Sequence, residues 1–234
     1  MRRAQNTVES IELAIFLALS GGLMDAYSYL VRGHVFANAQ TGNLLLFGVY
    51  MATGEFARAS HYILPVIAFA VGIGLTHLVS LTWKYENFTW HIEAVIFEIV
   101  VLASVGFVPE GRPLLANCIT SFACGIQVQA FRVLHGRPFA TTMCIGNLRS
   151  GTHELVTVLT TKKKQALEDA LLYYGVIIFF VFGAILGSGL IPLLGTHTIW
   201  VSPALLTAAL IILLVNKCPH AKTPKKAAQQ KSKN

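Results

Sequence analysis

Long runs of apolar residues alternate with short polar turns along the whole sequence. A helix that crosses a bilayer needs about 20 mostly apolar residues. Two segments are shorter or more polar than this, 37–53 and 140–161. Six segments reach the required length: 11–31, 61–83, 88–108, 114–134, 170–191 and 198–216. The pattern predicts an all-α polytopic membrane protein, a helical bundle of six long transmembrane helices plus two shorter polar-headed helices, with six to eight spans.

The composition agrees with a chain that is surrounded by lipid. Hydrophobic residues make up 54% of the 234 residues and charged residues only 12%, whereas a soluble domain carries about 25% charged residues. So little charge cannot cover a globular surface in water, which excludes a soluble enzyme or a nucleic-acid-binding module. We therefore expect the lipid bilayer as the partner of this surface, and no nucleic acid.

The net charge of +7 is concentrated at the ends of apolar segments. Nine of the 18 basic residues lie in Lys162–Lys164 and in the tail from Lys217 to Lys233. Such clusters mark the cytoplasmic side of membrane proteins. We expect a multi-pass protein of the plasma or inner membrane with both termini in the cytoplasm: residues 1–10 at the start and a basic, disordered tail at 217–234.

The second half of the sequence repeats features of the first at a displacement of 104 residues. The matches are Gly21 with Gly125, Asp25 with Gln129, Ala26 with Ala130, Leu30 with Leu134, and Gly42-Asn43-Leu44 with Gly146-Asn147-Leu148. A slip of one residue also brings segment 33–37 onto 136–140. The order of these matches predicts a duplication, with a first membrane repeat at 11–108 and a second at 114–216.

The two short segments determine how the predicted halves are related. If both span the bilayer, the chain has eight crossings and parallel halves. If both enter only part way, it has six crossings and inverted halves. The distribution of Lys and Arg satisfies the positive-inside rule in either case, so both arrangements stay open. In duplicated transporters the binding site lies between the halves.

Two sequence elements resemble those of a known family. Residues 21–26 contain a Gly-x-x-Asp-Ala element inside the first helix, and residues 36–43 end in Thr-Gly-Asn at the start of the next. Both are similar to elements of the YoaK-like bacterial integral membrane proteins, a family of unknown function. The resemblance covers roughly residues 10–216, although some members carry Met where this chain has Gln40. It implies a membrane location, and neither a substrate nor a mechanism.

Asp25 is the first candidate functional residue, because ionisable groups at membrane depth are costly and usually line a cavity or pair with another charge. Tyr29 lies one turn further along the same face. Asp25 is therefore a candidate for binding a substrate or a coupling ion. The structural alternatives are an ion pair with Arg149 and capping of the neighbouring short helix.

The Thr-Gly-Asn element suggests a helix that begins at membrane depth. Thr41 and Asn43 can satisfy free backbone N–H groups at a helix start, and Asn147 occupies the position equivalent to Asn43. The positive end of such a helix favours an anionic group. The alternative is a capped turn between packed helices.

The third candidate group distinguishes the two halves. Arg149 and His153 share a helix face, and Glu154 lies about 100° away. This group suits proton transfer or a pH-sensitive gate, or it holds helices together through polar pairs. Gln129 is a further candidate because it aligns with Asp25. Gln127 and Arg132 in segment 114–134 and Glu98 in segment 88–108 are weaker candidates.

These residues favour a gradient-driven transporter or channel-like permease for a small solute, and the helix N-termini suggest an anionic one. The alternatives are a non-catalytic membrane partner or sensor that uses the basic tail, and a membrane-embedded enzyme. We expect no enzymatic activity, because no catalytic motif is found. We also expect no metal or other cofactor, because the four cysteines lack metal-binding spacing. The Gly-rich helix faces leave a homo-oligomer open.

Overall fold

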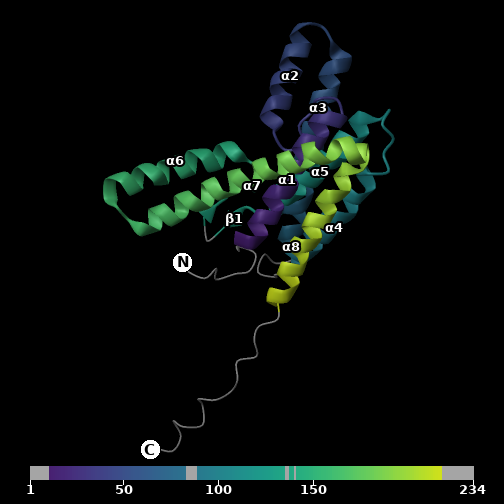
Figure 1. Cartoon of the computed structure of the whole chain (residues 1–234). Helices are drawn as coiled ribbons and strands as arrows, with labels where there is room; N and C mark the ends of the chain where they lie inside the picture. Colours follow the sequence, from purple (N-terminus) through teal and green to yellow (C-terminus); the bar gives the residue numbers. More distant parts are fainter. Residues whose placement is uncertain (1–10, 83–88, 135–136, 140, 218–234) are drawn as a thin grey trace, which may run out of the picture.

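The computed structural model describes residues 11–82, 89–134, 137–139 and 141–217, which form eight α-helices (Figure 1). Apart from Lys217, the expected terminal segments 1–10 and 217–234 lie outside these ranges. The helices are α1 (Ile11–Val31), α2 (Gln40–Ala52), α3 (Phe56–Thr82), α4 (Thr89–Val105), α5 (Pro113–Ala130), α6 (Cys144–Thr161), α7 (Lys164–Leu194) and α8 (Val201–Lys217). The 3-10 helix η2 (Gly195–Trp200) precedes α8, and a short antiparallel pair, β1 (Val133–Leu134) and β2 (Arg137–Pro138), follows α5. The predicted all-α fold class is confirmed.

Helix boundaries follow the apolar segments, with two main differences. Helices α3 and α7 begin at Phe56 and Lys164, earlier than the apolar segments 61–83 and 170–191. Both extra turns contain alanine and charged residues, most of which favour a helix. Hydropathy detects only the part of a helix that suits lipid, so a polar extension of the same helix escapes it.

The outer surface of the helices is apolar. Three helical stretches in the described ranges are long and apolar enough to cross a membrane: Ile11–Val31, Phe56–Leu81, and Lys164–Val215, which continues from α7 into α8. Only 17% of the apolar 18-residue window that qualifies the last stretch is buried inside the protein. Exposed leucines and phenylalanines at this density require a lipid environment.

The helices of the two halves of the sequence are interleaved. Helix α1 packs along α7 and α8, whereas α5 packs along α3 and α4. The short helices pack within their own halves, α2 against α3 and α6 against α7. The first helix of each half therefore packs against the last two long helices of the other half: α1 against α7 and α8, and α5 against α3 and α4.

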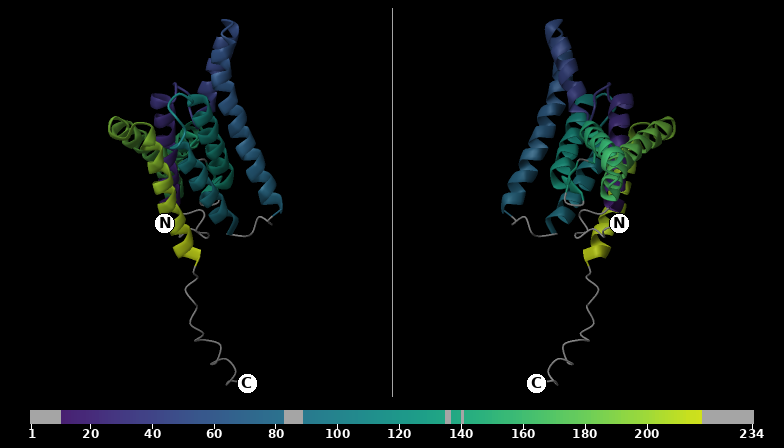
Figure 2. Two further views of the ribbon diagram at one scale, coloured as in Figure 1. Left: turned by 90° about the vertical axis from the view of Figure 1, so that its right-hand side faces the viewer. Right: turned by 90° about the vertical axis from the view of Figure 1, so that its left-hand side faces the viewer.

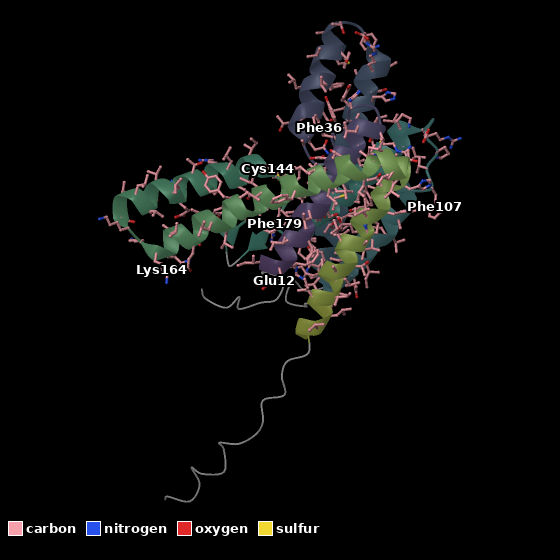
Figure 3. All side chains as sticks on the ribbon, viewed as in Figure 1. Glu12, Phe36, Phe107, Cys144, Lys164 and Phe179 are labelled. Atoms are coloured by element: carbon pink, nitrogen blue, oxygen red, sulfur yellow. The ribbon has the colours of Figure 1, made fainter. Side chains whose placement is uncertain are left out.

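Corresponding helices run in opposite directions (Figures 1 and 2). In these views α1 and α4 run upward, and α5 and α8 run downward. The start of α1 and the end of α8 lie at the same lower end of the bundle. The tip of the α2–α3 hairpin lies at the top of Figure 1, whereas Lys164, at the tip of the α6–α7 hairpin, lies near the level of Glu12 at the lower end (Figure 3). In Figure 1 the α2–α3 hairpin thus projects upward, and the α6–α7 hairpin extends sideways, with its tip near the level of the lower end.

Helices α1 and α7 approach each other through glycine. A Cβ at Gly22 would overlap the carbonyl oxygen of Phe180, and a Cβ at Gly183 would overlap that of Leu19. Both obstacles are backbone atoms, which cannot swing aside. The absence of a side chain at both positions therefore sets how closely the two helices pack.

Helices α3 and α5 meet in the same way. A Cβ at Gly125 would overlap the carbonyl oxygen of Phe69, and one at Gly72 would overlap that of Phe122. Gly125 thus has the same kind of contact in this crossing as Gly22 has in the other, and the two positions are 103 residues apart. This agrees with the one-residue slip found for segment 33–37.

A fully buried arginine fixes the turn after α1. The Arg32 side chain donates through Nε to the Tyr27 hydroxyl at 2.7 Å, and through Nη1 and Nη2 to the carbonyls of Pro109 and Val108 at 3.0 and 2.9 Å. The Asn117 side chain donates to the Arg32 carbonyl at 2.7 Å. The end of α1 is thereby tied to the turn between α4 and α5.

Candidate functional site

Asp25 lies buried in α1 and caps the neighbouring short helix. Its Oδ1 accepts the backbone N–H of Asn38 at 2.7 Å, and the N–H groups of Ala37 and Ala39 also interact with the carboxylate. Ala39, the residue before α2, makes no side-chain capping bond of its own. The carboxylate of Asp25 thus supplies the negative charge that the start of α2 favours.

The loop before α2 is held by two asparagines. The Asn38 side chain donates to the Gly21 carbonyl at 3.1 Å. Asn43, fully buried, accepts the Phe36 N–H at 3.0 Å and donates to the Phe36 carbonyl at 2.8 Å. The Asn43 side chain therefore stabilises the turn that leads into α2, which is the structural alternative for the Thr-Gly-Asn element.

The start of α6 reaches the same part of α1 from the other half. The side chain of Thr142 fills the space that a Cβ at Gly21 would occupy, and Cys144 is close enough to Asp25 to be affected by its charge. Figure 3 labels Cys144 at the inner end of α6 and Phe36 near the inner end of α2. The N-termini of both short helices thus meet beside Gly21, and we call this region the polar centre, defined by Gly21, Asp25, Asn38, Gln127, Thr141 and Thr142.

Gln127 of α5 joins the polar centre to α1. Its Nε2 donates to the Leu17 carbonyl and to the Thr141 hydroxyl, both at 3.1 Å. Its Oε1, and the hydroxyl of Thr142, are buried without a hydrogen-bond partner among the described residues. The start of α6 therefore presents an unused hydroxyl, that of Thr142, whereas the unused atom beside the start of α2, Asn38 Oδ1, can only accept a hydrogen bond.

Several predicted site residues lie elsewhere. Tyr29 is 40% exposed and packs its ring against His34 and Phe36. Thr41 is exposed on α2. Gln129 lies 3.4 Å from His77 Nδ1, between α5 and α3. Gln129 therefore lies between α5 and α3 and outside the polar centre, and its alignment with Asp25 stays a prediction.

Four predicted site residues lie on α6, and of these only Asn147 is buried. Arg149 and His153 are exposed, and Glu154 is half-buried. Helix α6 packs mainly against α7, and Arg149 lies on its exposed side. Within the part of the chain that the structure describes, the Arg149–Asp25 ion pair considered as an alternative is not formed.

Sequence reasoning missed Asn38, Thr141 and Thr142, and placed Gln127 among weaker candidates. Asn38 and the two threonines stand immediately before short helices, and this position was their only signal. Among the described residues, no group of three or more His, Cys, Asp or Glu side chains is arranged to bind a metal.

The fold and the polar centre define a class, that of helical membrane proteins with polar groups buried in mid-bundle. Residues 13–212 match the family described as "Protein of unknown function (DUF1275)", and the chain belongs to this family. It is also 28% identical over 198 residues to the UPF0700 transmembrane protein YoaK of Bacillus subtilis (strain 168), a match that covers 81% of this chain and 87% of the relative. No solved structure matches the chain. The resemblance to YoaK-like proteins is confirmed, and the chain is a transmembrane protein of this family.

Proposed function

We propose that the chain is a gradient-driven transporter or channel-like permease for a small anionic solute, built as two inverted repeats. The single observation that carries the proposal is the meeting of two helix N-termini at the polar centre. Helices that begin at membrane depth form the binding sites of many transporters. The proposal gives the chain no catalytic role.

The contrast between α2 and α6 indicates where the solute binds. A helix N-terminus favours an anion because its first N–H groups are free. Asp25 already occupies that position at α2. The start of α6 has the unused Thr142 hydroxyl beside it, which can donate to an anion, and Met143, the residue before it, makes no side-chain capping bond. We assign the anion to the start of α6.

The interleaved packing supports two inverted halves. The α1–α7 and α5–α3 crossings have the same glycine contacts, and corresponding helices run in opposite directions (Figure 2). In this arrangement α1, α3, α4, α5, α7 and α8 cross the bilayer, and α2 and α6 do not. The Lys162–Lys164 cluster then lies at the same end as the start of α1, which the positive-inside rule makes cytoplasmic.

Anion flux into proteoliposomes tests the proposal. We expect the purified protein to conduct at least one of a panel of chloride, nitrate, phosphate and small carboxylates. Thr142→Val keeps the side-chain shape and removes the unused hydroxyl, so it should reduce this flux without lowering stability. Thr160→Val, at an exposed position of the same helix, is the matched control. Absence of flux for the whole panel, or equal flux in both variants, would contradict the proposal.

A further inference from the structure

Glu98 of α4 is a buried carboxyl group outside the polar centre. Its side chain is fully buried, and neither carboxyl oxygen has a hydrogen-bond partner among the described residues. Native proteins pair nearly all such groups, so an unpaired one calls for an explanation. An ionised carboxylate without donors or a counter-charge is far too costly in such a place.

The surroundings of Glu98 are apolar. On the same face of α4, Val95, Leu102 and Val105 are fully buried members of the main hydrophobic core. Helix α4 packs against α5 and α8, and also contacts η2, in which His197 packs against Trp200. Between Val201 and Val215, α8 has no titratable side chain. Helix α5 has no Asp, Glu, Lys, Arg or His, and no side chain in the described ranges donates a hydrogen bond to Glu98.

One group on α5 connects Glu98 to the polar centre. The buried thiol of Cys124 is close enough to both Asp25 and Glu98 to be affected by the charge of each. Cys124 also interacts with the Asn38 side chain and lies 3.7 Å from the Met24 sulfur. Cys124 is therefore within electrostatic reach of both Glu98 and Asp25 of the polar centre.

The two buried carboxyl groups differ in their partners. Asp25 accepts backbone N–H groups, which stabilise its ionised form and commit it to capping α2. Glu98 accepts no hydrogen bond from the described residues, so the buried carboxyl group is stable only in its protonated, neutral form. A metal ion would need several oxygen ligands, and the described residues show no such set around Glu98.

We propose that Glu98 binds a proton inside the bundle and is the proton-coupling residue of the permease. The coupling part rests on the proposed function, and the proton site does not. An anion at the start of α6 lies near the negative charge of Asp25, so a proton bound close by favours its entry. When the bundle opens and hydrates Glu98, the carboxyl group releases its proton to water.

Infrared spectroscopy of the reconstituted protein tests the proton site without any solute. At neutral pH we expect the C=O band of a protonated carboxylic acid in the wild type. The band should disappear in Glu98→Gln and Glu98→Leu and persist in Asp25→Asn. Absence of the band in the wild type, or its persistence in both Glu98 variants, would overturn the proposal.

Stability and proton flux separate coupling from a structural role. Because Glu98 makes no hydrogen bond to any residue that the structure describes, Glu98→Leu should unfold at the same temperature as the wild type or higher, and a marked loss of stability would overturn the proposal. Proton movement under an imposed nitrate gradient, followed with an entrapped pH-sensitive dye, should be lost in Glu98→Gln. If the wild type shows the infrared band and no flux of any anion, the proton site stands and the permease does not.

Discussion

Replacing Gly183 by alanine is expected to lower the free energy of unfolding by more than the roughly 1–3 kcal/mol typical of an overpacked core. The new methyl group would overlap the carbonyl oxygen, carbonyl carbon and Cα of Leu19. All three are backbone atoms of a helix, so the whole of α1 must shift. Because α1 also packs against α8, the shift loosens a second contact.

Helix α7 contains its own control for this substitution. A Cβ added at Gly189 would have no other atom within 4 Å, and alanine is the better helix former by about 1 kcal/mol. Gly189→Ala should therefore leave stability unchanged or raise it. Thermal unfolding in detergent, followed by tryptophan fluorescence, measures both variants. Equal effects at the two positions would contradict the close crossing.

Replacing Asp25 by alanine is expected to cost about 2–5 kcal/mol, because it leaves buried N–H groups at the start of α2 without their acceptor. The Asn38 N–H loses a 2.7 Å bond. Asp25→Asn keeps one acceptor oxygen in place, so it should cost less. Exposed Glu93, changed to Gln, is the control for loss of a carboxylate.

Hydrogen exchange locates the effect of the Asp25 variants. In Asp25→Ala the amides of Ala37, Asn38 and Ala39 should exchange faster, since the cap that protects them is gone. Amides in the middle of α4 should keep their protection. Unchanged exchange at residues 37–39 would show that Asp25 does not cap α2.

The sequence predicts the helices well because lipid imposes a strong constraint. A helix in hydrocarbon must be long and apolar, and segments such as 11–31 match α1 over its full length. The same constraint separated 37–53 and 140–161 as shorter or more polar helices. The sequence does not show where the first residues of these two helices lie in the bundle, because the contact of Thr142 with Gly21 joins residues far apart in the sequence.

The candidate site was predicted only in part, and the errors have physical causes. Adjacent positions on a helix differ by about 100° in direction, so an alignment of two sequence segments does not fix which of them face the centre; Gln129 lies beside His77. Arg149 was expected to need a buried partner, yet α6 buries only one face. Glu98 drew little attention because a single carboxylate in an apolar run carries no motif; only its lack of partners in the folded bundle distinguishes it.

The account depends most on two inverted halves whose hairpins project to opposite sides of the membrane. Ala57 and Lys163 are exposed near the two hairpin tips, so each can carry a single cysteine in a background without the four native ones. With an impermeant thiol reagent on intact cells, Ala57→Cys should react and Lys163→Cys should react only after lysis. Reaction of both positions from the same side would contradict the inverted arrangement, and with it the meeting of two helix starts at one centre between the halves.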